Sequence, residues 1–236
     1  MDYNDAPLWQ GREAHHRAAI DAAIKAGVKH IYYTSLAFAT PSKAGVMRAH
    51  IRTEQYLSEL ADQGKVDYTI IREGLYNESW PLYFGYYFRL RDEKRHQVVV
   101  AGDGPISWTS IADMAFGTAK IISAPSDAWK GKTLYLSQNK TCSLHEIARK
   151  VSSSQGHDVH VKVVSRKEYE DHYAANGTDR ASVEWWSTTY DALKDGECDI
   201  KDSTLETMLR EAGREPTSIY DTIAEMLGGE GGQIAG

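Results

Sequence analysis

The first third of the chain alternates between helical and strand patterns of hydrophobic residues. Residues 13–26 (EAHHRAAIDAAIKA) place alanines on one helical face and end at Gly27, a residue type that typically ends a helix in the left-handed conformation. The run 28–34 (VKHIYYT) follows as a strand, 44–60 is again helical, and 66–72 (VDYTIIR) is a second strand. Alternating strands and helices predict βαβ units and a parallel sheet.

The residue composition and the lengths of the strand patterns change after residue 74. An aromatic-rich segment (LYNESWPLYFGYY) is followed by three short strand patterns, at 97–100, 132–136 and 159–164. Serines that precede an acidic residue by three positions predict three helix starts, at Ser110, Ser143 and Ser165.

These patterns divide the chain into three parts. The first part, 1–74, has the alternating pattern of a parallel α/β core, and the C-terminal part, 75–227, has the changed pattern. The pattern is helical from residue 179 onward, and the glycine-rich residues 228–236 are expected to form a flexible tail.

Composition narrows the class of protein. The 236 residues carry 27 Lys+Arg against 33 Asp+Glu, a formal charge of -6, so we expect no nucleic-acid contact, because phosphate binding needs a basic surface. No apolar run approaches the ~20 residues of a membrane span. Cys142 and Cys198 are too few for a disulfide framework, so we expect a cytoplasmic protein that acts on a small molecule.

A glycine-rich phosphate-binding turn is not found between a strand and a helix. Dinucleotide-binding domains normally start with a strand, such a turn and a helix, whereas the dense glycines here lie at 102–104 and in the tail. In the common strand order 3-2-1-4-5-6, strand 28–34 as strand four would then lack a neighbour. We therefore expect an incomplete Rossmann-like parallel sheet and a chain that is a fragment, is poorly soluble, or forms a homodimer through the exposed sheet edge.

Several segments together resemble the NmrA-like family of atypical short-chain dehydrogenases, particularly its fungal members. The resemblance runs from about residue 12 to 227, through AIDAAIKAGVKHIYYTSLAFA, SKAGVMRAHIRTEQYLSEL, VDYTIIREGLYNESWPLYFGYY and VVVAGDGPISWTSIADMA. It implies that 1–74 are the remainder of a Rossmann-like NAD(P)-binding core, and that 75–227 combine a smaller α/β C-terminal substrate lobe with returning core elements. It also implies an NAD(P)H-dependent oxidoreductase that reduces a small, aromatic or polyketide-type metabolite in fungal secondary metabolism, with NADP(H) contacts restricted to the nicotinamide side.

Ligands in doubly wound sheets bind at the carboxyl ends of the strands. The cofactor-binding candidates there are Thr34, Ser35 and Leu36 after the first strand, and Glu73, Gly74 and Leu75 after the second. The substrate-binding candidates, whose alternative is a place in the core of the C-terminal lobe, are Tyr76, Asn77, Trp80, Tyr83 and Tyr87.

The catalytic candidates are His50 and Ser35. Ordinary short-chain dehydrogenases use a Tyr-x-x-x-Lys pair, and by the resemblance His50 stands near the lysine position and Val46 near the tyrosine. An imidazole titrates near neutral pH, so His50 could protonate or polarise an acceptor together with Ser35. A structural role is the alternative for a lone histidine, and Glu54, one helical turn later, could bind it.

Other polar residues receive structural interpretations. Arg72 ends a buried strand and is expected to be anchored by a carboxylate such as Glu54. Asp113 is interpreted as helix capping. His157 and His160 are expected on opposite faces of a strand, so no metal site is predicted.

Two other functions remain open from the sequence. One is a cofactor-independent isomerase or cyclase that retains the aromatic pocket and His50. The other is a non-catalytic, nucleotide-sensing regulatory protein, because the NmrA-like family includes such regulators.

Overall fold

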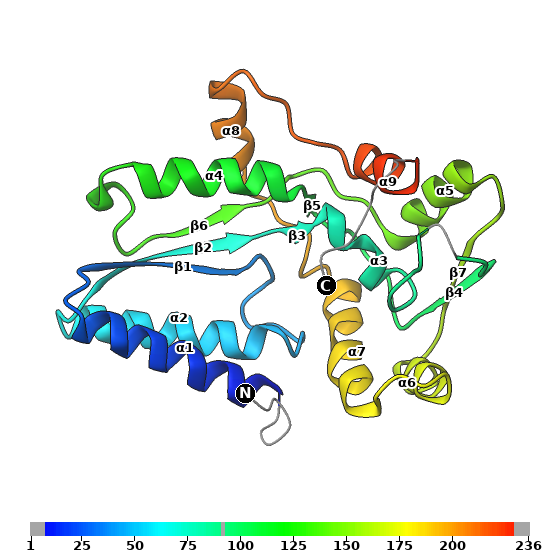
Figure 1. Ribbon diagram of the computed structural model, residues 1–236, viewed down its shortest axis with the longest axis horizontal. Coiled ribbons are helices and arrows are strands. Elements are labelled where there is room, and N and C mark those ends of the chain that lie inside the picture. The colour runs from blue at the N-terminus through cyan, green and yellow to red at the C-terminus, as the bar shows by residue number, and fades with distance from the viewer. Residues whose placement is uncertain (1–7, 91–92, 229–236) are drawn as a thin grey trace.

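The structure is a computed structural model and describes residues 8–90 and 93–228 (Figure 1). Its α-helices are α1 (Leu8–Lys25), α2 (Met47–Asp62), α3 (Trp80–Tyr83), α4 (Ile111–Ser123), α5 (Leu144–Gln155), α6 (Arg166–Ala175), α7 (Arg180–Lys194), α8 (Thr204–Glu211) and α9 (Ile219–Gly228). Its strands are β1 (His30–Leu36), β2 (Asp67–Glu73), β3 (Leu75–Tyr76), β4 (Gln97–Val100), β5 (Trp108–Thr109), β6 (Thr133–Leu136) and β7 (His160–Val163). The predicted tail lies outside the described residues apart from Gly228.

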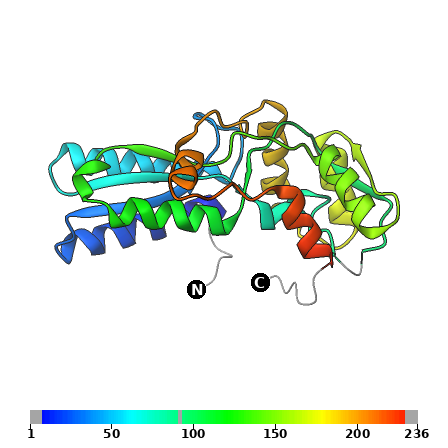
Figure 2. The ribbon, with the colours of Figure 1, turned by 90° about the horizontal axis from the view of Figure 1, so that it is seen from above.

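A parallel sheet with the order β1-β2-β6 organises the N-terminal half of the molecule. Helices α1 and α2 cover one face of this sheet, and α4 and α8 lie on the other (Figures 1 and 2). Neighbouring residues of β2 serve both layers, because successive strand side chains point to opposite faces: Ile70 packs with Leu57 of α2, and Ile71 packs with Met114 of α4 and Leu209 of α8. The predicted parallel α/β architecture is confirmed.

β1 occupies an edge of this sheet. It pairs with β2 from His30↔Asp67 to Leu36↔Glu73, and no other strand in residues 8–90 and 93–228 pairs with it. Central β2 pairs on its other side with β6. The edge position of β1 agrees with the exposed edge expected from the sequence.

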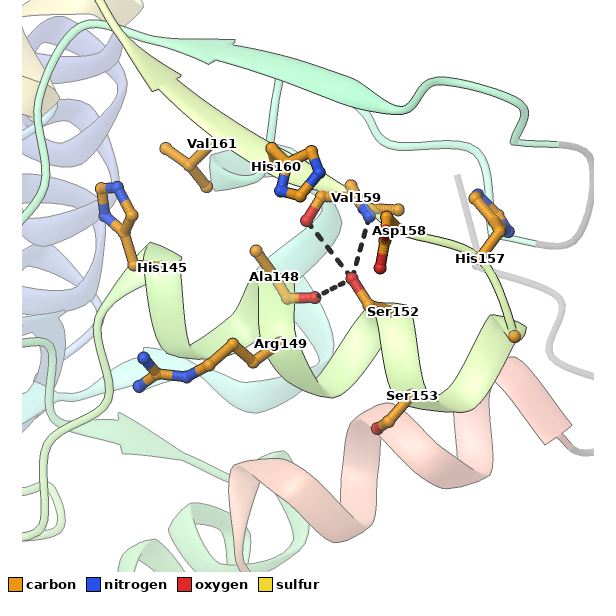
Figure 3. A pocket seen from close by; sticks show the side chains of 11 residues that line it. His145, Ala148, Arg149, Ser152, Ser153, His157, Asp158, Val159, His160 and Val161 are labelled. Carbon is orange, nitrogen blue, oxygen red and sulfur yellow. Dashed lines mark hydrogen bonds between the residues drawn. The ribbon is translucent and has the colours of Figure 1, made fainter.

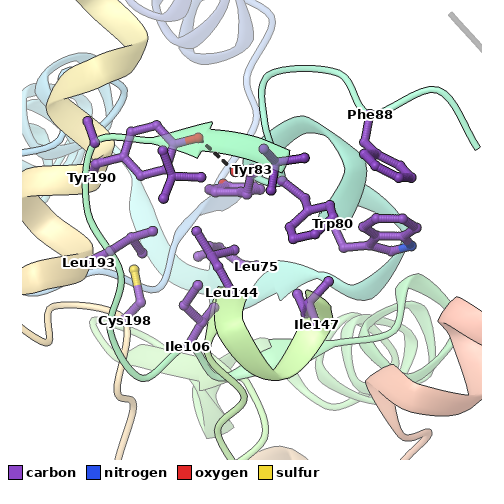
Figure 4. Close-up of a cluster of buried hydrophobic side chains, with 14 of the residues drawn as sticks. Leu75, Trp80, Tyr83, Phe88, Ile106, Leu144, Ile147, Tyr190, Leu193 and Cys198 are labelled. Atoms are coloured by element: carbon purple, nitrogen blue, oxygen red, sulfur yellow. Dashed lines mark hydrogen bonds between the residues drawn. The ribbon is translucent and has the colours of Figure 1, made fainter. Parts of the chain in front are cut away.

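The C-terminal half builds a second core around aromatic side chains. Strands β4 and β7 pair in parallel, α5 packs against α9, and α6 packs against α7. Figure 4 shows Trp80, Tyr83 and Phe88 gathered in this core, where Tyr190 donates a hydrogen bond of 2.7 Å to the carbonyl of Tyr83. The division of the chain at residue 74 stays a prediction.

The 102–104 glycine turn packs closely against α7 in this core. A Cβ on Gly104 would stand 2.0 Å from the carbonyl oxygen of Leu193, so only glycine lets the turn approach α7 this closely. Asp103 between the glycines accepts a hydrogen bond of 2.8 Å from the backbone N–H of Leu144, the first residue of α5. This turn therefore fixes α5 against α7.

Helix starts followed the sequence signals closely. Ser143 forms the complete capping box with Glu146, as predicted, and Ser165 accepts a hydrogen bond from the backbone N–H of Glu168. The single helical pattern predicted after residue 179 is in fact three helices, α7, α8 and α9. The short pair of strands β3 and β5 was not predicted, because two-residue strands carry no periodic signal. Among the described helices, none is long and apolar enough to cross a membrane.

Candidate active site at the carboxyl ends of the sheet

The carboxyl ends of β1, β2 and β6 meet at one edge of the sheet, since all three strands are parallel. These strands end at Leu36, Glu73 and Leu136. Helix α2 returns from this edge, so its first turn, which carries His50, lies there as well. The predicted catalytic and cofactor-binding residues therefore lie at one edge of the sheet.

A buried ion pair joins α2 to β2 at this edge. Arg72 donates to Glu54 at two points, Nε–Oε1 at 3.1 Å and Nη2–Oε2 at 2.6 Å, with side chains only 7% and 14% exposed. The predicted anchoring of Arg72 by Glu54 is confirmed. A second donor to Glu54 is Ser35, whose hydroxyl lies 2.6 Å from Oε1 and is buried. The structure thus commits the Ser35 hydroxyl hydrogen to Glu54, and its predicted catalytic role stays a prediction.

His50 faces Tyr33 rather than Glu54. Its Nδ1 lies 2.8 Å from the phenol oxygen of Tyr33, which is also 3.1 Å from Nδ1 of His16 on α1. Burial, with the charges of Arg12, His16 and Arg72, lowers the pKa of His50 to about 4. His50 is therefore neutral at pH 7, which suits a hydrogen-bond donor or a base and not a cationic acid.

Tyr33 and His16 are functional candidates that the sequence analysis missed. Strand alternation places Tyr33 on the same face of β1 as Ser35, toward α2, and that signal was present in the pattern. Burial raises the pKa of Tyr33 to about 12, so its phenol keeps its proton at neutral pH. The contact with His16 depends on how α1 packs on α2, which no local pattern encodes.

A groove of about 350 Å³ opens on the opposite face of the sheet. At its carboxyl-edge end, Tyr76 donates a hydrogen bond of 2.6 Å to Oε2 of Glu73. Its wall is a stripe of small and apolar residues on α4: Ile111, Met114, Ala115, Thr118, Ala119 and Ile122. Ile111 and Ile122 are 47% and 53% exposed, so α4 has an apolar side that the described residues do not cover. The sequence signal for this groove was that α4 is apolar on most of its sides.

The five predicted substrate residues lie in different surroundings. Trp80 and Tyr83 are buried in the core of the C-terminal lobe, and Tyr87 is exposed on the surface. Asn77 is fully buried, and its side-chain amide donates to Thr222 at 3.0 Å. Of the five predicted substrate residues, Tyr76 alone borders the groove. The aromatic-rich segment mainly supplies the core of the C-terminal lobe.

The remaining cofactor candidates lie around the strand ends. Thr34 is exposed on β1, and Leu36 is half-buried. Gly74 passes so close to β5 that a Cβ would stand 2.5 Å from Oγ1 of Thr109, and Leu75 is buried and paired with Trp108.

The first N–H groups of α2 and α4 are bonded within the protein. A pyrophosphate site needs free backbone N–H groups at a helix N-terminus. The N–H of Met47, the first residue of α2, donates to the carbonyl of Ala44 at 3.0 Å, and the N–H of Ile111, which starts α4, donates to the carboxylate of Glu78 at 3.1 Å. The strand-end groups remain as candidates for the nicotinamide side.

The Asp113 side chain does not cap α4. Ser110 is the cap and accepts from the backbone N–H of Asp113, while the buried carboxylate accepts a hydrogen bond of 2.7 Å from the N–H of Thr217. It also lies 3.7 Å from the guanidinium of Arg214. The capping interpretation of the Asp113 side chain was therefore wrong: this carboxylate fastens the segment before α9 to α4.

A second groove, of about 670 Å³, lies between α5 and β7 (Figure 3). His157 and His160 both line it, which corrects the prediction of opposite faces, because β7 begins only at His160. Ser152 at its centre is bonded to the backbone of Ala148 and Val159. No group of three or more His, Cys, Asp or Glu able to hold a metal occurs in the described part of the chain.

Comparisons with known proteins identify relatives of the chain among oxidoreductases. No family model matches the chain. The chain is 29% identical over 218 residues to an NmrA-like family domain-containing oxidoreductase, flvB, of Aspergillus flavus, covering 90% of this chain and 66% of the relative. It is 34% identical over 160 residues to quinone oxidoreductase 2 of Escherichia coli, covering 67% of this chain and 52% of that protein.

A solved structure shares the fold. The NADPH complex of the NADPH-dependent quinone oxidoreductase of Escherichia coli superposes with a TM-score of 0.73 at 27% identity, over 89% of this chain and 70% of that chain. The chain thus spans only part of the length of the relatives it matches. The resemblance seen in the sequence is confirmed: this protein is a homologue of an NmrA-like oxidoreductase, at 29% identity over 90% of the chain.

Proposed function

We propose that this protein is an NAD(P)H-dependent oxidoreductase that acts on a small, aromatic or polyketide-type metabolite in fungal secondary metabolism. The observation that carries the proposal is the groove beside Glu73 and Tyr76, at the edge of the sheet where ligands of doubly wound folds bind. The relationship to an NmrA-like oxidoreductase and to a quinone oxidoreductase supports the reaction class.

The groove suits a flat, apolar ligand with one polar end. Its α4 wall offers aliphatic side chains for a ring, and its carboxyl-edge end offers the Tyr76–Glu73 pair. The phenol hydrogen of Tyr76 is already donated to Glu73, and burial raises the pKa of Tyr76, so the pair acts as an acceptor for a ligand hydroxyl and not as an acid.

His50 lies on the other face of the sheet from this groove. Arg72 points toward α2 and Glu73 toward α4, since they are successive residues of β2. A ligand that reaches both His50 and Tyr76 must therefore lie across the carboxyl ends of β1 and β2, where Thr34 is exposed. In this arrangement neutral His50 would donate a hydrogen bond to a substrate oxygen.

A cofactor-independent isomerase or cyclase is the second candidate. The observation that favours it is that the first N–H groups of both helix starts at the carboxyl edge are already used, that of Met47 by Ala44 and that of Ile111 by Glu78. Neutral His50 would serve such a reaction as a hydrogen-bond donor to a substrate oxygen, without a redox partner.

Titration calorimetry with NADPH and NADP separates the two candidates. The oxidoreductase proposal predicts heat of binding for NADPH, and NADPH oxidation in the presence of a small quinone as probe. Absence of heat at millimolar NADPH, together with absence of oxidation, would end the oxidoreductase proposal and leave the isomerase or cyclase.

A further inference from the structure

The hydrogen-bond network beside His50 fixes which atoms carry protons. It begins at the backbone carbonyl of Ala49, which can only accept a hydrogen bond. The hydroxyl oxygen of Thr53 lies 2.7 Å from this carbonyl oxygen, so Thr53 donates its single hydroxyl hydrogen to it. Thr53 is fully buried, so no solvent molecule competes for that hydrogen.

His16 must then donate to Thr53. Nδ1 of His16 lies 2.9 Å from Oγ1 of Thr53, whose hydrogen is already used, so Nδ1 carries a proton. The same N–H lies 3.1 Å from the phenol oxygen of Tyr33 and is shared between the two oxygens. Tyr33 is therefore an acceptor on this side.

The phenol hydrogen of Tyr33 is free to point the other way. The phenol also interacts with the Thr53 hydroxyl, whose oxygen already accepts from His16. Its other polar neighbour is Nδ1 of His50, 2.8 Å away, and donation there satisfies every group of the network. His50 then accepts on Nδ1. A neutral imidazole that accepts on Nδ1 carries its proton on Nε2.

We propose that Tyr33 is a positioning residue that holds His50 as the neutral tautomer with its proton on Nε2, so that the nitrogen of His50 not bonded to Tyr33 is an N–H donor and not a lone pair. His16 and Thr53 orient the Tyr33 hydroxyl and so set the direction of the whole network. The tautomer follows from the contacts alone, whereas its use in a reaction rests on the proposed function.

The surrounding charges keep His50 in this neutral form. Arg12 and His16 on α1 and Arg72 on β2 disfavour a cation. Glu54, one turn along α2, is held by Arg72 and Ser35, so its carboxylate is directed to β1 and β2 and not to His50. Protonation of Nδ1 would also force the Tyr33 hydroxyl to turn away from His50.

Nitrogen NMR of the imidazoles tests the tautomer directly. In the wild-type protein at pH 7, we expect the His50 resonances of a protonated Nε2 and an unprotonated Nδ1. In Tyr33→Phe, loss of the donor shifts the tautomer ratio about tenfold toward the Nδ1-protonated form. Tyr56→Phe is the matched control, because Tyr56 also lies between α1 and α2 but donates to Asp21 at the surface.

The outcomes separate this inference from the proposed function. A wild-type His50 protonated on Nδ1, or on both nitrogens, overturns the inference without any variant having to fold. An unchanged ratio in folded Tyr33→Phe also overturns it. If the tautomer is as stated but NADPH and a quinone give no reaction, only the proposed function fails; if turnover exists, Tyr33→Phe lowers kcat about tenfold with little change in KM.

Discussion

Arg72 on β2 and Glu54 on α2 meet in a two-point ion pair at the carboxyl edge of the sheet, with 2.6 Å between Nη2 and Oε2. Arg72 also donates to the phenol oxygen of Tyr135 on β6 at 3.1 Å. A single guanidinium thus links one helix and two strands. It also places Glu54 where Ser35 can donate to it, so this pair holds the candidate site in shape.

Removal of Arg72 should destabilise the fold strongly. Arg72→Ala leaves the buried Glu54 carboxylate without its partner, and we expect a loss of about 3–5 kcal/mol in the free energy of unfolding. Urea denaturation measures this loss. Arg180→Ala is the control, because Arg180 and its partners Asp171 and Glu184 are all about half exposed, and it should cost less than about 1 kcal/mol. Equal losses in the two variants would show that the Arg72 pair is not a structural anchor.

Gly104 should tolerate no side chain. Gly104→Ala places a Cβ against the Leu193 carbonyl and should force the 102–104 turn away from α7, with a loss of more than about 2 kcal/mol in stability. Gly11→Ala is the matched change in open space on α1 and should instead stabilise by up to about 1 kcal/mol. Thermal unfolding of both variants checks the prediction, and a neutral Gly104→Ala would refute the close approach.

His50 should make stability depend on pH between about 4 and 6.5. Its pKa is about 4 in the folded protein against an ordinary value of 6.5 in an unfolded chain, so the unfolded chain binds more protons in this range. The free energy of unfolding should rise with pH through this window, by roughly 3 kcal/mol in all. Below about pH 4 this whole amount is lost, because His50 is then protonated in both states. Burial of His16 acts in the same direction.

Urea denaturation across this pH range measures that dependence. His50→Gln should flatten most of it, whereas His15→Gln, at an exposed position on α1, should leave it in place. A wild-type protein whose stability is constant from pH 4 to 6.5 would show that His50 titrates normally.

The outer edge of β1 should pair with a second copy of this chain. The carbonyl of Lys29 and the N–H of Ala37 form hydrogen bonds with β2. Backbone groups of a strand alternate in direction, so the N–H of Thr34 points away from the sheet. The strand HIYYTSL contains no proline and no lysine of the kind that protects natural edges. Antiparallel pairing of two copies about a two-fold axis satisfies both edges at once.

Light scattering coupled to gel filtration tests this pairing. We expect a dimer for the wild type and for Thr34→Val, which keeps the N–H, and a folded monomer for Thr34→Pro, which removes it. A monomeric wild-type protein at tens of micromolar would contradict the prediction.

Local patterns of the sequence were enough to predict much of the fold. The strands of the main sheet were placed to within two residues, because helix-to-strand alternation and capping residues are local signals. The Arg72–Glu54 pair was predictable because a charge at the end of a buried strand requires a partner.

Contacts between distant segments could not be predicted in this way. Tyr33 meets His50 and His16 only once α1 and α2 pack side by side on β1. Trp80 and Tyr83 were assigned to a pocket because composition alone does not distinguish an aromatic binding surface from an aromatic core. The closeness of Gly104 to Leu193 likewise exists only in the assembled lobe.

NADPH oxidation with a small quinone, measured with the groove open and with the groove filled, tests the central claim most directly. Ala115→Trp should fill the groove from the exposed side of α4, and Ala18→Trp, at an exposed position of α1, is the matched control. We predict that the wild type and Ala18→Trp oxidise NADPH in the presence of the quinone. We predict at least about a tenfold loss in kcat/KM for Ala115→Trp. Equal activity in all three proteins would contradict the assignment of the groove as the substrate site.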